Sequence, residues 1–172
     1  QLTPSASRSF GDYWLGTWGS RVFRLKFSGL SEAKPSIQFM PVASLNTAFR
    51  NVIYAKMFRE DAAGHLYFST WGSGIIKIQG EHKSAQNPKF EVFDKAKSNL
   101  PTNHFADLLC LGDTLFLASG FGLCIFDTQS KKSDIYKFNS DDPESPFNGV
   151  TYLLPYSGNR LLVGTYGGPI LY

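Results

Sequence analysis

A phrase of nine residues recurs four times in this chain, and its spacing constrains the fold more than any other feature. The copies are Gly11–Gly19 (GDYWLGTWG), Gly64–Gly72 (GHLYFSTWG), Gly112–Gly120 (GDTLFLASG) and Asn159–Gly167 (NRLLVGTYG). In this alignment Thr17, Thr70, Ala118 and Thr165 share one position, at separations of 53, 48 and 47 residues. Repeats of this length that are filled with short apolar runs are typical of β-propeller blades. We therefore predict an all-β chain of four-stranded antiparallel blades.

The second repeat shows most clearly how one copy becomes one blade. Apolar and β-branched residues at 52–58, 65–70 and 74–78 predict the first three strands, and the alternating segment 89–93 predicts the outer strand. Residues 60–64 and 71–74 are predicted turns, because glycine reaches positive φ without a steric penalty.

The other repeats follow the same order, and together they predict about three and a half blades. The expected strands are 13–17, 22–27 and 37–40 in the first repeat, 103–110, 114–119, 123–126 and 134–138 in the third, and 149–154, 161–165 and 170–172 in the fourth. The expected blades span approximately 1–45, 46–98, 99–143 and 144–172. Residues 1–10 make a poor first strand, and no segment combines helix caps with a 3.6-residue period.

An arc of this size is expected to need partners. Closed propellers typically have about four to eight blades, and an open arc exposes apolar faces that pack on neighbours in a closed ring. The chain is therefore expected to be a fragment of a larger propeller and to contact the rest of it. Alternatively, a homodimer closes a ring of seven or eight blades.

Composition excludes several classes of function. The chain has 172 residues and a formal net charge of +3, too small and too scattered a surplus to favour nucleic acid or direct membrane contact. No apolar run is long enough to span a membrane, and the first residues do not form a signal peptide. Cys110 and Cys124 fall on the first and third strands of one blade, so two buried thiols are expected rather than a disulfide.

The repeats resemble the two-component regulator propeller family. Its blade phrase, with Leu-Trp-Ile-Gly-Thr before a glycine-rich turn, matches Tyr13–Gly19 and Leu161–Gly168, and Asp61 fits its acidic turn. Residues 136–148 (YKFNSDDPESPFN) and 100–103 (LPTN) resemble its connectors between blades. The chain departs from the family where Tyr67, Leu115 and Leu162 replace the tryptophan kept at position 14. It departs again where Arg21 and Pro169 replace the second glycine of the turn.

The resemblance implies a sensory role. Members look like periplasmic input domains of Bacteroides-type hybrid two-component systems, anchored in the inner membrane and followed by a histidine kinase. Their ligands are commonly glycan fragments. The resemblance therefore implies a non-catalytic sensor domain that takes part in signal transduction, without a cofactor. The chain itself contains no ATP-binding motif.

One face of the arc carries the candidate ligand site. The turns between second and third strands and the connectors between blades open on the same face around the central channel. Aromatic faces stack on sugar rings, and Arg or Asn side chains hydrogen-bond hydroxyl groups. The candidate ligand-binding residues are Trp18, Trp71, Phe121, Tyr166, Arg50, His104 and Asn148. The alternatives are packing against the neighbouring blade for the aromatic residues, a structural role for His104 and a backbone-bonding turn role for Asn148.

Catalysis is the main competing class of function, because propellers also form lyases, glycosidases and lactonases. A catalytic channel needs several acids or histidines on its first strands, whereas here Lys56 and Asp107 are the only ionisable candidates near neutral pH. No hydrolase nucleophile motif or metal-ligand spacing is present, so we expect no catalytic residue and no metal site. A protein-interaction platform that uses the same rim stays open.

Overall fold

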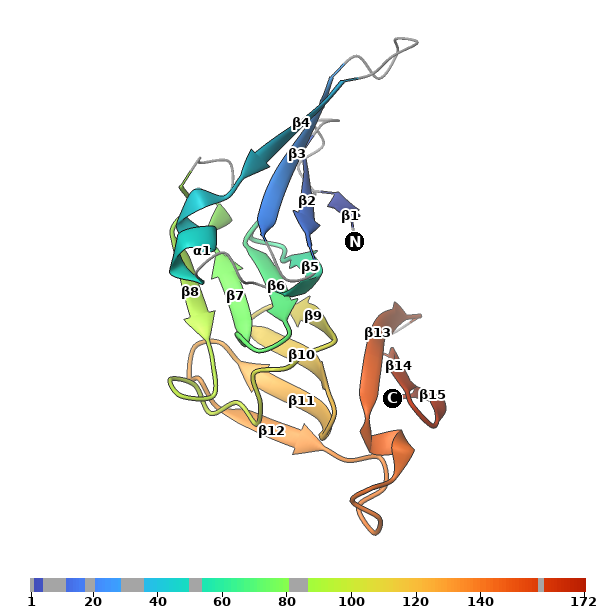
Figure 1. The fold of residues 1–172 in the computed structure, drawn as a ribbon. Coiled ribbons are helices and arrows are strands. Elements are labelled where there is room, and N and C mark those ends of the chain that lie inside the picture. The colour runs from blue at the N-terminus through green and yellow to red at the C-terminus, as the bar shows by residue number, and fades with distance from the viewer. Residues whose placement is uncertain are drawn as a thin grey trace.

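The computed structural model describes residues 2–4, 12–17, 21–28, 36–49, 54–80, 87–157 and 160–172 (Figure 1). In these ranges the strands form four sheets that follow one another along the chain, and every sheet pairs its strands antiparallel in chain order. Three sheets have four strands and the last has three. The predicted fold class, an all-β arc of about three and a half propeller blades, is confirmed.

The blades are numbered 1 to 4 along the chain. Blade 1 contains β1 (Leu2–Pro4), β2 (Asp12–Gly16), β3 (Val22–Ser28) and β4 (Ser36–Pro41). Blade 2 contains β5 (Ala55–Glu60), β6 (Leu66–Thr70), β7 (Ile75–Ile78) and β8 (Phe90–Phe93). Blade 3 contains β9 (Asp107–Leu111), β10 (Thr114–Ser119), β11 (Gly122–Asp127) and β12 (Ser133–Tyr136). Blade 4 contains β13 (Val150–Tyr156), β14 (Arg160–Thr165) and β15 (Gly168–Leu171).

The first strand of each blade lies nearest the centre of the arc. β5 contacts β9, and β9 contacts β13. Figure 1 shows β1, β5, β9 and β13 on the concave side, with β4, β8 and β12 at the outside. This arrangement brings side chains of β5, β9 and β13 together, although they are about fifty residues apart in the sequence.

The core consists of apolar layers between the blades, because side chains of a strand alternate between its two faces. On β10, Leu115 and Leu117 face blade 2, whereas Phe116 and Ala118 belong to the layer against blade 4. Trp14 and Phe58, with ring centroids 6.3 Å apart, lie in the layer between blades 1 and 2. Each described blade is thus stabilised mainly by its neighbours.

Two glycines let the outer strands approach closely. Gly74 and Gly122 precede or begin the third strands of blades 2 and 3 and have φ values of 76° and 136°. A Cβ atom would lie 2.1 Å from the Phe93 carbonyl oxygen at Gly74 and 2.5 Å from the Tyr136 carbonyl oxygen at Gly122. Only glycine fits both the backbone conformation and the space.

Two local features lie outside the predicted strands. β1 is a strand of only three residues that pairs with β2, in keeping with the poor first strand expected from residues 1–10. A short helix, α1 (Ala43–Ala48), follows β4 without a side-chain cap. The buried Asn46 holds it by accepting from the Val22 N–H at 3.0 Å and donating Nδ2 to the Val22 carbonyl at 3.3 Å. Tertiary contacts stabilise this helix, so sequence periodicity could not indicate it. No helix in the described ranges is long and apolar enough to cross a membrane.

Candidate functional site

A hydroxyl group closes each turn between a second and a third strand. Its oxygen donates to a carbonyl across the turn at 2.6 to 2.8 Å. The same oxygen accepts a backbone N–H from within the turn at 2.9 to 3.2 Å. The four donor–acceptor pairs are Thr17 with Arg21, Thr70 with Gly74, Ser119 with Gly122, and Thr165 with Gly168. We call this double hydrogen bond the hydroxyl clasp. It explains why the repeat keeps a small hydroxyl residue at this position.

The hydroxyl clasp corrects the repeat alignment in blade 3. Ser119, rather than Ala118, pairs with the glycine that opens the third strand and closes the turn. Ala118 pairs one step further along, with Leu123, and is buried in the layer against blade 4. The proposed equivalence of Ala118 with Thr70 and Thr165 is therefore wrong by one residue. One additional residue between Gly112 and the clasp causes the shift.

Three clasped turns expose an aromatic side chain. Trp71 is 45% exposed, Phe121 57% and Tyr166 73%. In these three turns the exposed aromatic residue follows the hydroxyl residue by one or two positions. Trp71 is half exposed, and its ring also contacts His104 in the connector that enters blade 3.

The three turns lie at the same end of their blades. The connector that enters blade 3 reaches the turn of Trp71, since Gly72 and Gly74 both donate to the Asn103 carbonyl, at 2.9 and 3.0 Å. The short helix η2 (Pro146–Asn148), which precedes blade 4, contacts both β11 and β14. We call this end of the arc the aromatic rim, defined by Trp71, His104, Phe121, Phe147 and Tyr166.

The surroundings of Trp71 combine aromatic and polar groups. The exposed His104 ring meets the indole edge-on, with centroids 5.2 Å apart. Lys56 Nζ lies 5.9 Å from the centroid of the indole. A bridge between Trp71 and His104 and the Phe105 N–H donated to the Thr70 carbonyl at 3.0 Å tie these groups to blade 3. The result is a fixed, partly exposed aromatic surface with hydrogen-bond donors beside it.

The remaining candidate residues differ in their positions. Tyr166 lies over Gly149, where a Cβ atom would be 2.3 Å from the phenol ring. Asn148 is buried, and its amide donates to the Asn139 and Asp142 carbonyls at 2.8 and 3.0 Å and accepts from the Asn139 N–H at 3.0 Å. Its side chain holds the connector together and is not presented to solvent. The structure thus gives Asn148 the turn role that was the alternative for it.

Two of the predicted residues, Trp18 and Arg50, lie outside the described residues. Sequence reasoning overlooked Phe147, which is 40% exposed and packs over Gly167. No repeat counterpart marks this residue, and its place beside Asn148 in the connector was the only available signal.

Asp107, the acid that a catalytic channel would use, is fully buried in the inner strands. Its Oδ1 lies 3.3 Å from Arg59 Nη2 and accepts the Leu108 N–H at 2.7 Å, while Oδ2 accepts the Leu153 N–H at 3.0 Å. It thereby joins blades 2, 3 and 4. Burial raises the pKa of the Asp107 carboxyl above its ordinary value, although the Leu153 N–H, the Arg59 charge and the Leu108 N–H oppose that shift. These partners give the carboxyl a structural role.

Other reactive groups do not join the rim. Cys110 lies on β9 and Cys124 on β11, with β10 between them, and both are free thiols. Burial raises the pKa of Cys110 to about 12, helped by the Asp61 charge, and that of Cys124 to about 11. Among the described residues, no group of three His, Cys, Asp or Glu side chains could hold a metal ion. The rim is suited to stacking and hydrogen bonding.

Comparisons with known proteins give a likeness of fold. No family model matches the sequence, and no curated protein matches it. A solved chain described as the extracellular domain of the hybrid two component system BT3049 from B. thetaiotaomicron has a TM-score of 0.69 and 14% identity, covering 99% of this chain and 21% of that one. The corresponding domain of BT4673 from the same organism has a TM-score of 0.60 and 14% identity, covering 100% and 20%.

A third solved chain has a different role. PorZ, described as an essential bacterial surface component of the type-IX secretion system of Porphyromonas gingivalis, has a TM-score of 0.54 and 14% identity, covering 99% of this chain and 20% of that one. The present chain thus spans about a fifth of the length of these proteins. It shares their propeller fold, and the extracellular domains of Bacteroides hybrid two-component systems are among the proteins that it is similar to.

Proposed function

We propose that this chain is a non-catalytic part of the periplasmic sensor region of a hybrid two-component histidine kinase, and that it binds a glycan-derived ligand at the aromatic rim. The exposed side chains of Trp71, Phe121 and Tyr166 carry the proposal, because three successive blades present an aromatic face at the same end. Sugar rings have apolar faces that stack on such side chains, while their hydroxyl groups take hydrogen bonds from neighbouring polar groups.

Two further observations support this function. The blade phrases resemble those of the two-component regulator propeller family, and the fold is similar to extracellular domains of hybrid two-component systems. The burial of Asp107 argues against an enzyme that works in the channel, since a carboxyl without solvent access and with three partners cannot reach a substrate.

The test is a titration of the chain with neutral oligosaccharides by isothermal calorimetry, with Trp71→Ala as the diagnostic variant. An aromatic contact contributes about 0.5–1.5 kcal/mol, so the affinity should fall about 2- to 12-fold. Because Trp71 lies in a solvent-facing turn, its removal should leave the melting temperature almost unchanged.

Tyr156→Ala is the matched control, because Tyr156 is 50% exposed and lies at the opposite end of blade 4. Its loss should not change oligosaccharide affinity. Equal losses in both variants, or a destabilised Trp71→Ala with unchanged affinity, would count against a ligand role for the rim. If the rim binds extended peptides and no oligosaccharide, it is a protein-interaction platform. Turnover of a glycan that is lost in Asp107→Asn would overturn the non-catalytic assignment.

A further inference from the structure

A polar cavity of about 230 Å³ lies between blades 2 and 3, at the end of the strands opposite the aromatic rim. β6 joins the two regions, because Tyr67 near its start borders the cavity and its last residue, Thr70, closes the turn of Trp71. The turns between first and second strands of both blades form the cavity walls. Its polar and charged lining residues are Asp61, His65, Tyr67, Lys77, Asp113 and Gln129.

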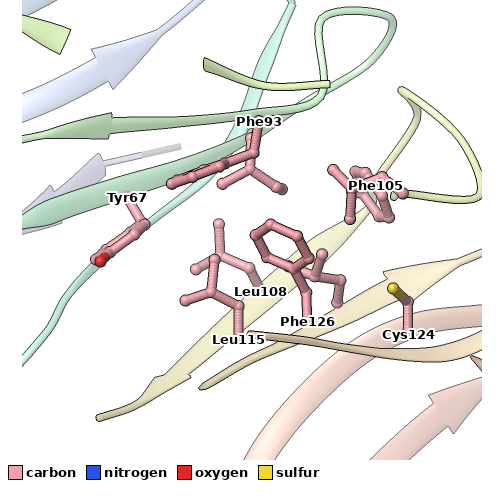
Figure 2. Close-up of a cluster of buried hydrophobic side chains, with 10 residues drawn as sticks. Tyr67, Phe93, Phe105, Leu108, Leu115, Cys124 and Phe126 are labelled. Carbon is pink, nitrogen blue, oxygen red and sulfur yellow. The ribbon is translucent and has the colours of Figure 1, made fainter. Parts of the chain in front are cut away.

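The most informative lining residue is Tyr67. Its side chain is only 1% exposed and belongs to the apolar layer between blades 2 and 3. Figure 2 shows the hydroxyl oxygen pointing away from this cluster, and the same residue lines the cavity. The hydroxyl forms no hydrogen bond with any described residue. Among the described residues no buried side-chain oxygen or nitrogen lacks a hydrogen-bond partner, so the Tyr67 hydroxyl is open to the cavity and can bond a molecule there.

The protonation of Tyr67 makes its hydroxyl a permanent donor. Burial raises the pKa of the phenol well above its ordinary value, and the negative charge of Asp61 raises it further. Lys77 Nζ lies 5.3 Å from the ring centroid, so an ammonium group borders the same side chain. The phenol therefore keeps its proton throughout the physiological pH range and can both donate and accept.

The other lining residues supply both hydrogen-bond acceptors and donors. Asp61 uses Oδ1 to accept the N–H groups of Ala63 and His65, at 3.0 and 2.8 Å. Asp113 uses Oδ1 to accept from Gln129 Nε2 at 3.2 Å. The second carboxylate oxygen of each accepts no hydrogen bond from the described residues. His65 Nδ1 accepts the Gly80 N–H at 3.0 Å, which leaves the proton of the neutral ring on Nε2.

We propose that this cavity is a second binding site, for a small uncharged polyhydroxylated molecule of monosaccharide size. A hydroxyl group both donates and accepts, so vicinal hydroxyls match walls that hold both acceptors and donors. At roughly 30 Å³ per water, the volume equals that of about seven or eight water molecules, which is the scale of one sugar ring. Two carboxylates against one ammonium give the walls a negative balance, which disfavours anions.

The site is independent of the aromatic rim, because the two regions lie at opposite ends of β6 and share no residue. Its test uses glucose, galactose, mannose and xylose as neutral probes and glucuronate as the anionic one. Each is added at about 10 mM, tenfold above a millimolar dissociation constant. Binding to the whole chain is followed by saturation-transfer NMR and calorimetry.

Tyr67→Phe is the diagnostic variant, because it removes only the hydroxyl and keeps the ring in the apolar layer. At least one neutral monosaccharide should bind the native chain, and the variant should weaken it about 5-fold, as for one lost hydrogen bond. The free energy of unfolding should not fall, since the hydroxyl has no protein partner to lose. Asp113→Asn, which changes an acceptor without changing size, should weaken the same sugar.

Tyr166→Phe is the matched control at the rim and should leave monosaccharide binding unchanged. The proposal is overturned if no neutral monosaccharide binds, if glucuronate binds more tightly than the neutral sugars, or if Tyr67→Phe binds as well as the native chain. A loss of binding in Trp71→Ala and not in Tyr67→Phe would move the sugar to the rim. The two proposals therefore fail separately.

Discussion

The junction between blades 2 and 3 and the junction between blades 3 and 4 use the same strand geometry but are filled differently. In the first junction the rings of Tyr67, Phe93, Phe105 and Phe126 are all buried, and Phe93 meets Phe126 edge-on at 5.3 Å (Figure 2). The second junction has smaller buried side chains, such as Ala118, Val150 and Val163. Side-chain volume therefore differs between two interfaces that have the same backbone plan.

The consequence is an apolar cavity of about 330 Å³ in the second junction. Leu109 and Phe116 border it from blade 3, and Tyr156, Leu161 and Tyr172 border it from blade 4. The corresponding cavity in the first junction is smaller and polar, because aromatic rings fill the apolar space and only the turns remain apart. Neighbouring propeller sheets diverge away from the axis. The volume of the side chains between them therefore decides how far from the axis the space between two blades stays filled.

The largest expected effect separates the two junctions. Phe126→Ala should lower the free energy of unfolding by about 3–5 kcal/mol, because the lost ring leaves a void among fully buried neighbours. Phe116→Ala should cost about 1–2 kcal/mol, since Phe116 is only partly buried and already borders a cavity. Urea denaturation followed by fluorescence measures both values.

Similar costs for Phe126→Ala and Phe116→Ala would mean that the second junction is packed as tightly as the first. In that case the cavity between blades 3 and 4 would not reflect weaker packing. Leu117→Ala, on the face of β10 that points to blade 2, provides a further comparison. Its cost should resemble the first junction rather than the second.

The next largest effect concerns the residue that links both junctions. Asp107→Ala removes the partner of Arg59 on β5 and of the Leu153 N–H on β13, so it weakens both junctions at once. We expect the free energy of unfolding to fall by about 2–4 kcal/mol, because the buried N–H groups of Leu108 and Leu153 lose their acceptor. Asp107→Asn should lose less, since one amide oxygen still accepts. If Asp107→Ala were as stable as the native chain, the carboxyl would not be a structural link.

Sequence periodicity was sufficient for the blades because each repeat has the same local chemistry. Short apolar runs between turn residues predicted the strands of blades 2 and 3 to within a few residues at most ends. The alignment failed at Ala118, where one extra residue moves the hydroxyl clasp to Ser119. The failure has a physical reason: the clasp needs a hydroxyl, and Ala118 lacks one.

The candidate site was only partly accessible to sequence reasoning. Trp71, Phe121 and Tyr166 were proposed because they occur in repeated turns, and the structure shows that all three are exposed. Arg59 and Tyr67 were missed, because their contacts join strands of different blades or depend on which end of a side chain faces a cavity. Such contacts depend on how neighbouring sheets meet, and a pattern within one repeat does not contain that information.

A smaller effect should appear when pH is varied around Asp107. Its pKa is raised in the folded chain by burial, so the folded state binds this proton more tightly than the unfolded state. The stability of the native chain relative to Asp107→Asn should therefore increase as pH falls through the folded pKa toward about 3.9, the ordinary value for Asp. Urea midpoints of both proteins between neutral pH and pH 4 measure this difference, and the opposite trend would mean that Arg59 outweighs burial.

The smallest expected effect comes from the outer edge of the junction between blades 2 and 3. Lys131 Nζ in the turn after β11 lies 2.9 Å from Glu91 Oε1 on β8, with both side chains about half exposed. Glu91→Gln should cost about 0.2–1 kcal/mol, because water already solvates an exposed ion pair. The cost should shrink in 1 M salt, where the Debye length is about 3 Å. A fall in the free energy of unfolding above about 2 kcal/mol that persists in salt would mean that this junction depends on the surface ion pair as much as on its buried aromatic rings.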